Sequence, residues 1–164
     1  MTITELLDAF KARNDAEDAY IREFGPQRLG PSGDVSEVLC IDGKTRRPTS
    51  PMMKEFYRYA RWWRFDAVLH HWIDPVDVAE LMKTGHVPNL IANDCDEYGA
   101  LMVVKDPMTV ASIFLIDDPQ AVYNRCYFVF DTGRTEPRII TAGAEVHVFK
   151  SLQDYLVAEA GLGS

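Results

Sequence analysis

The sequence has few of the residues that mark disulfide-bonded, zinc-bound or membrane proteins. Its three cysteines, Cys40, Cys95 and Cys126, are odd in number and far apart, and none belongs to a CxxC pair. This pattern argues against a disulfide framework and against a zinc knuckle. No apolar run is long enough to span a bilayer, and the first residues lack the basic and apolar segments of a secretory signal. We therefore expect a cytoplasmic protein without a membrane partner.

Catalytic motifs are missing too. The sequence contains no GxSxG, GxGxxG or GxxxxGK[ST] segment. His70 and His71 are adjacent, so on a helix they point in different directions and cannot form the two-histidine metal face of an HExxH motif. We predict no metal, no cofactor and no catalytic residue. For the alternative of a small enzyme without a recognisable motif, Cys95, His70 and His71 are the first residues to mutate.

The chain is acidic, and its charge is unevenly spread. The formal net charge is −8, yet residues 44–64 hold seven basic residues and one acidic residue, so this segment carries +6 and the remainder carries −14. Proteins that bind nucleic acid usually present a net basic surface, whereas the field of this chain repels phosphate. The charge therefore favours a protein that binds a basic macromolecule, or an ordinary soluble domain, over a nucleic-acid-binding protein.

The basic segment runs into an unusual aromatic stretch, FYRYARWWRF, at residues 56–65. On a helical wheel most of its aromatic residues share one face and its arginines share the other, as in an amphipathic helix packed on a core. Ser50 is a favourable N-cap and Pro51 suits the first helical position. These features predict a helix from about residue 51 to about residue 72.

Two aromatic residues of this stretch, Tyr57 and Phe65, fall among the arginines of the polar face. Together with Arg58, Arg61 and Arg64 they define an alternative surface, on which aromatic rings stack with bases and arginines neutralise phosphates. The alternative function is therefore a nucleic-acid-binding module.

Helical patterns dominate the first half of the chain. Residues 4–24 place apolar residues at helical spacings, and Thr2 and Glu5 stand at capping-box spacing before them. A short helix is predicted from Asp74 to Gly85. The segment EVLCIDGKTRR predicts a strand and a turn at Asp42-Gly43.

The second half is rich in short β-prone runs separated by turn residues: ALMVV, SIFLI, CYFVF, RIIT and EVHVF. Their close spacing favours an antiparallel meander, because parallel strands need long crossovers. A last helix is predicted after Ser151. We therefore expect a single α+β domain over residues 1–164, in which a mainly helical half (1–88) packs on an antiparallel sheet that is followed by a C-terminal closing helix (89–164).

The segments LIANDCDEYGALMVV and EVHVFKSLQDYLVAEAG, within residues 90–160, resemble the C-terminal half of the SUKH superfamily. Those domains often show an Ile-Ala pair before an acidic turn, a glycine and a strand, and they end in a strand and a Ser-capped helix. The resemblance implies a bacterial immunity protein, which would neutralise a cognate toxin, such as a basic nuclease, by covering its active site without acting as an enzyme.

If the chain is such a protein, its acidic turns are the expected contact surface, because loops on a rigid scaffold often carry binding residues. Carboxylates there would steer a basic toxin toward the complex, and neighbouring tyrosines would anchor it. The predicted partner-binding residues form two groups: Asp94, Asp96, Glu97 and Tyr98 in one turn, and Asp117, Asp118 and Tyr123 around another.

Overall fold

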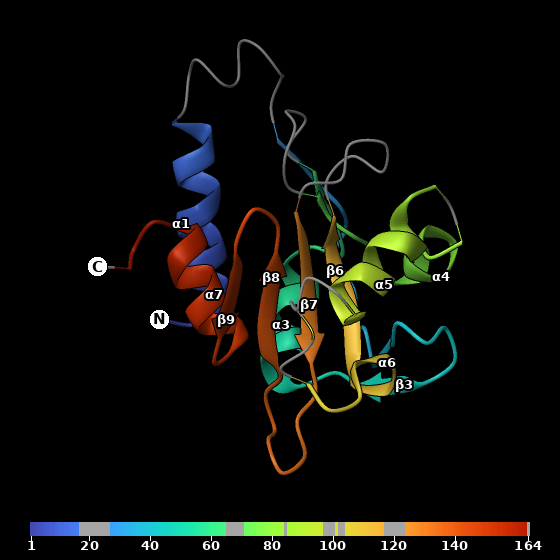
Figure 1. Cartoon of the computed structure of the whole chain (residues 1–164). Helices are drawn as coiled ribbons and strands as arrows, with labels where there is room; N and C mark the ends of the chain where they lie inside the picture. Colours follow the sequence, from blue (N-terminus) through green and yellow to red (C-terminus); the bar gives the residue numbers. More distant parts are fainter. Residues whose placement is uncertain are drawn as a thin grey trace.

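The protein has the predicted α+β architecture, in which helices lie on both faces of a curved antiparallel sheet (Figure 1). The computed structural model describes residues 1–16, 27–64, 71–83, 85–96, 101, 104–116 and 124–163. Within these ranges, no helix combines the length and the hydrophobicity needed to cross a membrane.

The main sheet has seven strands in the order β1-β4-β5-β6-β7-β8-β9, and every neighbouring pair is antiparallel. Its strands are β1 (Arg28–Leu29), β4 (Trp63–Arg64), β5 (His71–Trp72), β6 (Ala111–Ile116), β7 (Arg125–Val129), β8 (Arg138–Ala142) and β9 (Val146–Phe149). A separate hairpin pairs β2 (Glu37–Leu39) with β3 (Arg46–Pro48) around the predicted turn, where Gly43 has φ 73°. The sheet of the second half thus follows the predicted meander from β6 onward.

The helices are α1 (Ile3–Asp15), α3 (Pro51–Tyr59), the 3₁₀ turn η1 (Pro75–Asp77), α4 (Val78–Leu81), α5 (Val87–Asp96), α6 (Pro107–Val110) and α7 (Leu152–Glu159). Their starts follow from local side chains. Thr2 and Glu5 form the predicted capping box of α1, and the Ser50 hydroxyl accepts the Met53 N–H at 3.3 Å. Ser151 caps α7 in the same way, by accepting the N–H of Asp154.

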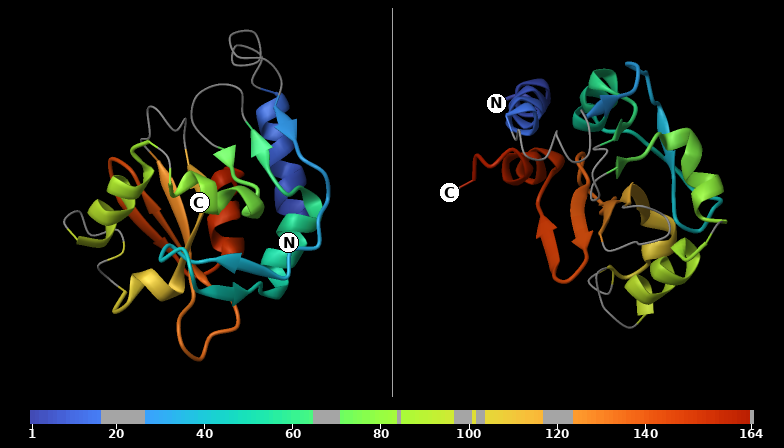
Figure 2. Two further views of the ribbon diagram at one scale, coloured as in Figure 1. Left: turned by 90° about the vertical axis from the view of Figure 1, so that its right-hand side faces the viewer. Right: turned by 90° about the horizontal axis from the view of Figure 1, so that it is seen from above.

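Two apolar cores lie on the two faces of the sheet. Helices α1, α3 and α7 cover one face, and α4, α5 and α6 lie over the other (Figure 2). Along β7 the side chains alternate between these cores, with Phe128 in the first and Tyr127 in the second. Strand β6 also contributes to both cores, but a register shift between Ile113 and Leu115 interrupts its alternation, and the consecutive residues Phe114 and Leu115 both lie in the first core.

Three predictions about secondary structure need correction. The aromatic helix ends at Tyr59, because Ala60 is extended and Trp63 then pairs with Trp72 in the sheet. Strands β1, β4 and β5 belong to the first half, so the division into a helical half and a sheet half is too simple. In the run ALMVV, the described residues Leu101 and Val104 lie in a turn and a bend, not in a strand.

Candidate functional site

The sequence predicted that Asp94 lies on an exposed turn, but the structure places it elsewhere. It is on α5, and its side chain is only 1% exposed. Its carboxylate accepts hydrogen bonds from Arg125 on β7, from Nε at 2.7 Å and from Nη2 at 2.6 Å, and a further one from the Tyr127 hydroxyl. The prediction of Asp94 as an exposed partner-binding residue is therefore wrong, because the helix continues through it and turns it toward the sheet.

This buried network fixes α5 on the sheet. Burial alone would lower the pKa of Arg125, but the hydrogen bond and the charge of Asp94 raise it. Burial and the same carboxylate raise the pKa of Tyr127 well above its usual value. At neutral pH the arginine is therefore a cation and the tyrosine a neutral donor, as the bidentate arrangement requires. The network holds α5 in place, and α5 forms one wall of an apolar hollow, which is described next.

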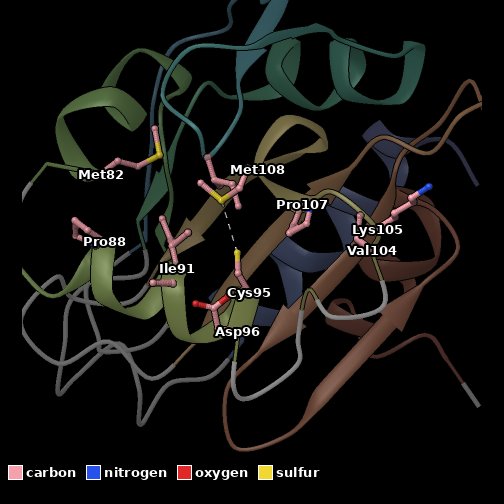
Figure 3. Close-up of a pocket in the computed structure, with 11 residues that line it drawn as sticks. Met82, Pro88, Ile91, Cys95, Asp96, Val104, Lys105, Pro107 and Met108 are labelled. Carbon is pink, nitrogen blue, oxygen red and sulfur yellow. Dashed lines mark hydrogen bonds between the residues drawn. The ribbon is translucent and has the colours of Figure 1, made fainter.

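The hollow lies between α5 and the segment that leads into α6, and its volume is about 680 Å³ (Figure 3). This size is within the range of small-ligand sites. Most of its lining is apolar, and the residues are Ile41, Met82, Pro88, Ile91, Ala92, Cys95, Asp96, Val104, Lys105, Pro107 and Met108. The hollow can therefore hold an apolar group and exclude water from it.

Few polar groups line this hollow, and they differ in what they can do. Asp96 is exposed and places its carboxylate beside Cys95, whereas Lys105 extends away from the other labelled side chains (Figure 3). The Cys95 sulfur lies 4.0 Å from the Met108 sulfur. Burial, together with the charges of Asp94 and Asp96, raises the pKa of Cys95 to about 11, so the thiol is protonated at neutral pH and is a weak nucleophile.

Several residues of the alternative basic and aromatic surface already contact other parts of the molecule. Tyr57 is 2% exposed and packs against Phe56, so its ring cannot stack on a base. Arg58 forms an ion pair with Asp34 at 2.9 Å, and Arg61 forms one with Asp74 at 3.0 Å. The placement of Tyr57 on the polar face is therefore wrong, because α3 buries this residue against β7.

Arg64 is on β4 and not on the helix with Arg58, and its guanidinium lies 5.6 Å from the centre of the Trp62 ring. Because the helix ends at Tyr59, the three arginines do not form the single stripe that the helical wheel predicted. An arginine stacked on an aromatic ring is a common intramolecular contact.

Several predicted site residues lie outside the described residues: Glu97, Tyr98, Asp117, Asp118, Tyr123, Phe65 and His70. His71 is on β5 and half-buried. Cys40 and Cys126 are buried. Among the described ranges, no group of three or more histidine, cysteine or acidic side chains is arranged to hold a metal ion.

Sequence patterns did not reveal the partners of Asp94 or the lining of the hollow. Arg125 and Tyr127 lie more than thirty residues beyond Asp94 and alternate on β7, and this alternation is the only local signal that they share a face. The hollow joins residues from several elements, and no single segment predicts it. No family model, no curated protein and no solved structure matches the chain.

Proposed function

We propose that this chain is a non-enzymatic binding protein that neutralises a basic protein toxin, such as a nuclease, by occluding its active site. The observation that carries the proposal is an apolar hollow of about 680 Å³, with the exposed carboxylate of Asp96 on its lining, in a chain of net charge −8. An apolar pocket beside acidic groups suits a partner that presents an anchoring side chain next to basic residues.

In this proposal the hollow and the charge have separate roles. The partner inserts an apolar side chain between α5 and α6, and the burial of that side chain slows dissociation. The overall negative field, to which Asp96 adds locally, speeds the association of a basic protein. Glu97, Asp117 and Asp118, which the sequence predicts as contacts, would add to this field.

The nucleic-acid alternative is less favoured for a specific reason. Its proposed stacking residue Tyr57 is in the core, and Arg58 and Arg61 are each within hydrogen-bonding distance of a carboxylate. Binding phosphate with these arginines would require breaking both ion pairs against an unfavourable net charge.

The proposal is tested by measuring whether this chain protects cells from a toxic protein. Each gene that neighbours this one in its native genome is expressed alone and together with it, and cell growth is measured. We expect one neighbouring product to arrest growth alone and to be tolerated when this chain is present, with the two proteins co-purifying as a complex that weakens as salt rises. If no neighbouring product is toxic, or if a toxic one is not relieved, the proposal fails.

A further inference from the structure

The lining of the hollow between α5 and α6 is rich in sulfur. Three of its residues carry a sulfur atom: Met82 at the end of α4, Cys95 on α5 and Met108 on α6. Figure 3 shows these sulfur atoms following one another across the hollow, with the Asp96 carboxylate beyond Cys95. The sulfur atoms of Cys95 and Met108 are 4.0 Å apart. Polarisable groups therefore form one surface of the hollow, and a carboxylate lies at its end.

Among the lining residues that the structure describes, none is aromatic. The core on the other face of the sheet differs, because its rings pack on one another, as Phe114 and Phe128 do with centroids 4.0 Å apart. Thioether sulfur atoms make favourable contacts with aromatic rings at about 5 Å, often at the ring edge. A ring that made such contacts with the sulfur atoms of the hollow would therefore come from another molecule.

The polar groups of this surface suit a ring that carries an N–H donor. Burial, with the charges of Asp94 and Asp96, raises the pKa of Cys95 to about 11, so its thiol is neutral and does not repel the electron-rich face of a ring. Asp96 is exposed, and its carboxylate accepts hydrogen bonds without donating any. Lys105, the other charged residue of the lining, extends away from the sulfur atoms (Figure 3). The acceptor at the end of the hollow is therefore the carboxylate of Asp96.

We propose that the hollow receives a tryptophan side chain of the protein partner, with the indole ring against the three sulfur atoms and its Nε1–H donated to Asp96. This inference rests on the proposed function, which requires an anchoring side chain in the hollow. A leucine side chain could occupy the same space but would supply neither a ring nor a donor, and phenylalanine would supply the ring alone. Tryptophan is also enriched among the few residues that dominate the binding energy of interfaces.

Titration of the full chain with N-acetyl-tryptophanamide and N-acetyl-leucinamide tests this preference, because the two probes differ only in their side chains. The methionine ε-methyl groups are labelled with ¹³C and followed by NMR. The ring current of the tryptophan probe should shift the signals of Met82 and Met108. It should leave those of Met52 and Met53 unchanged, because these residues pack in the core on the other face of the sheet. We expect the tryptophan probe to bind about tenfold more tightly than the leucine probe.

Variants separate the effect of sulfur from that of volume, and the backbone amide signals of α5 report the affinities. Met82→Leu with Met108→Leu removes two sulfur atoms and nearly conserves volume, so it should reduce the preference for tryptophan to about threefold or less. Met52→Leu is the matched control away from the hollow and should keep the preference. The 1-methyl derivative of the tryptophan probe has no indole N–H and should bind about threefold more weakly. Asp96→Ala should remove that difference.

Three results would overturn the inference: equal affinity for the two probes, no shift of the Met82 and Met108 signals, or a full preference for tryptophan in the double leucine variant. The titration uses this chain alone, so it is independent of toxin protection. Protection from a toxic neighbour together with a hollow that prefers leucine would leave the proposed function standing and refute this inference. Without any toxic neighbour the proposed function would fail, and the titration would still decide which side chain the hollow prefers.

Discussion

At the scale of single residues, the strongest claim concerns the buried carboxylate of Asp94. Asp94→Asn should keep the shape of the side chain but remove the charge opposite Arg125. Removing one partner of a buried ion pair costs about 3–5 kcal/mol, because the remaining charge is left without compensation. We therefore expect the free energy of unfolding, measured by urea denaturation at neutral pH, to fall by about this amount.

The same helix supplies a matched control for that prediction. Asp96→Asn removes an exposed carboxylate two positions away and should change the unfolding free energy by less than about 0.5 kcal/mol. If the two variants were equally stable, Asp94 would not be the residue that fastens α5 to the sheet.

Cys95 leads to a prediction about reactivity. Its pKa of about 11 is two units above the usual 9.0, so at pH 8 about a hundredfold less thiolate is present than for an unperturbed thiol. Alkylation by iodoacetamide at pH 8, followed by intact-mass spectrometry, should be slower by about this factor than that of a small free thiol. The rate should rise steadily as the pH approaches 11.

A Cys95 that reacted as fast as the free thiol would contradict the burial described for it. It would also revive the possibility of a cysteine nucleophile in the hollow, since the thiolate is the reactive form. Cys40 does not confuse the measurement, because it is buried and burial raises its pKa to about 11 as well.

At the scale of elements, the N-cap of α1 is a feature that the sequence predicted and the structure confirms. Thr2→Ala should lower the unfolding free energy by about 1 kcal/mol, because the Glu5 N–H loses its acceptor and the α1 residues Leu6 and Phe10 are part of the core. Thr2→Ser keeps the hydroxyl and should cost only a few tenths of a kcal/mol. Thermal unfolding of both variants measures the difference, and equal midpoints would argue against a role for the cap.

Caps, turns and the strands from β6 to β9 could be predicted because each depends on residues that are close in sequence. The end of the aromatic helix could not, because the helical periodicity of residues 56–65 continues past Tyr59, and only a partner outside this stretch makes Trp63 part of a strand. That partner, Trp72, pairs with Trp63 across the sheet and packs edge-on against it at 5.3 Å. Tertiary packing thus decided between two local structures that the sequence allowed.

The acidic segment around Asp94 was predicted as a turn for a similar reason. Acidic residues next to a glycine are typical of loops, and Pro88 suggests a break in helical structure. Pro88, however, lies in the first turn of α5, where its missing N–H costs little. The buried salt bridge depends on Arg125, and nothing local to α5 indicates that residue.

At the scale of the whole molecule, a net negative field surrounds the apolar hollow beside α5. The basic segment does not reverse this field, because Arg46, Arg58 and Arg61 each lie near a carboxylate. The molecule therefore suits a basic protein partner, and the hollow gives that partner a place for an anchoring side chain.

The most direct test measures the binding of the toxic neighbouring product to two tryptophan variants of α5 by surface plasmon resonance. Ala92 lines the hollow, and Asn93 is exposed on the same helix but does not line it. Ala92→Trp should fill the hollow and raise the dissociation constant by about tenfold or more, whereas Asn93→Trp should leave it unchanged. If both variants bound and protected equally well, the hollow between α5 and α6 would not be the binding site.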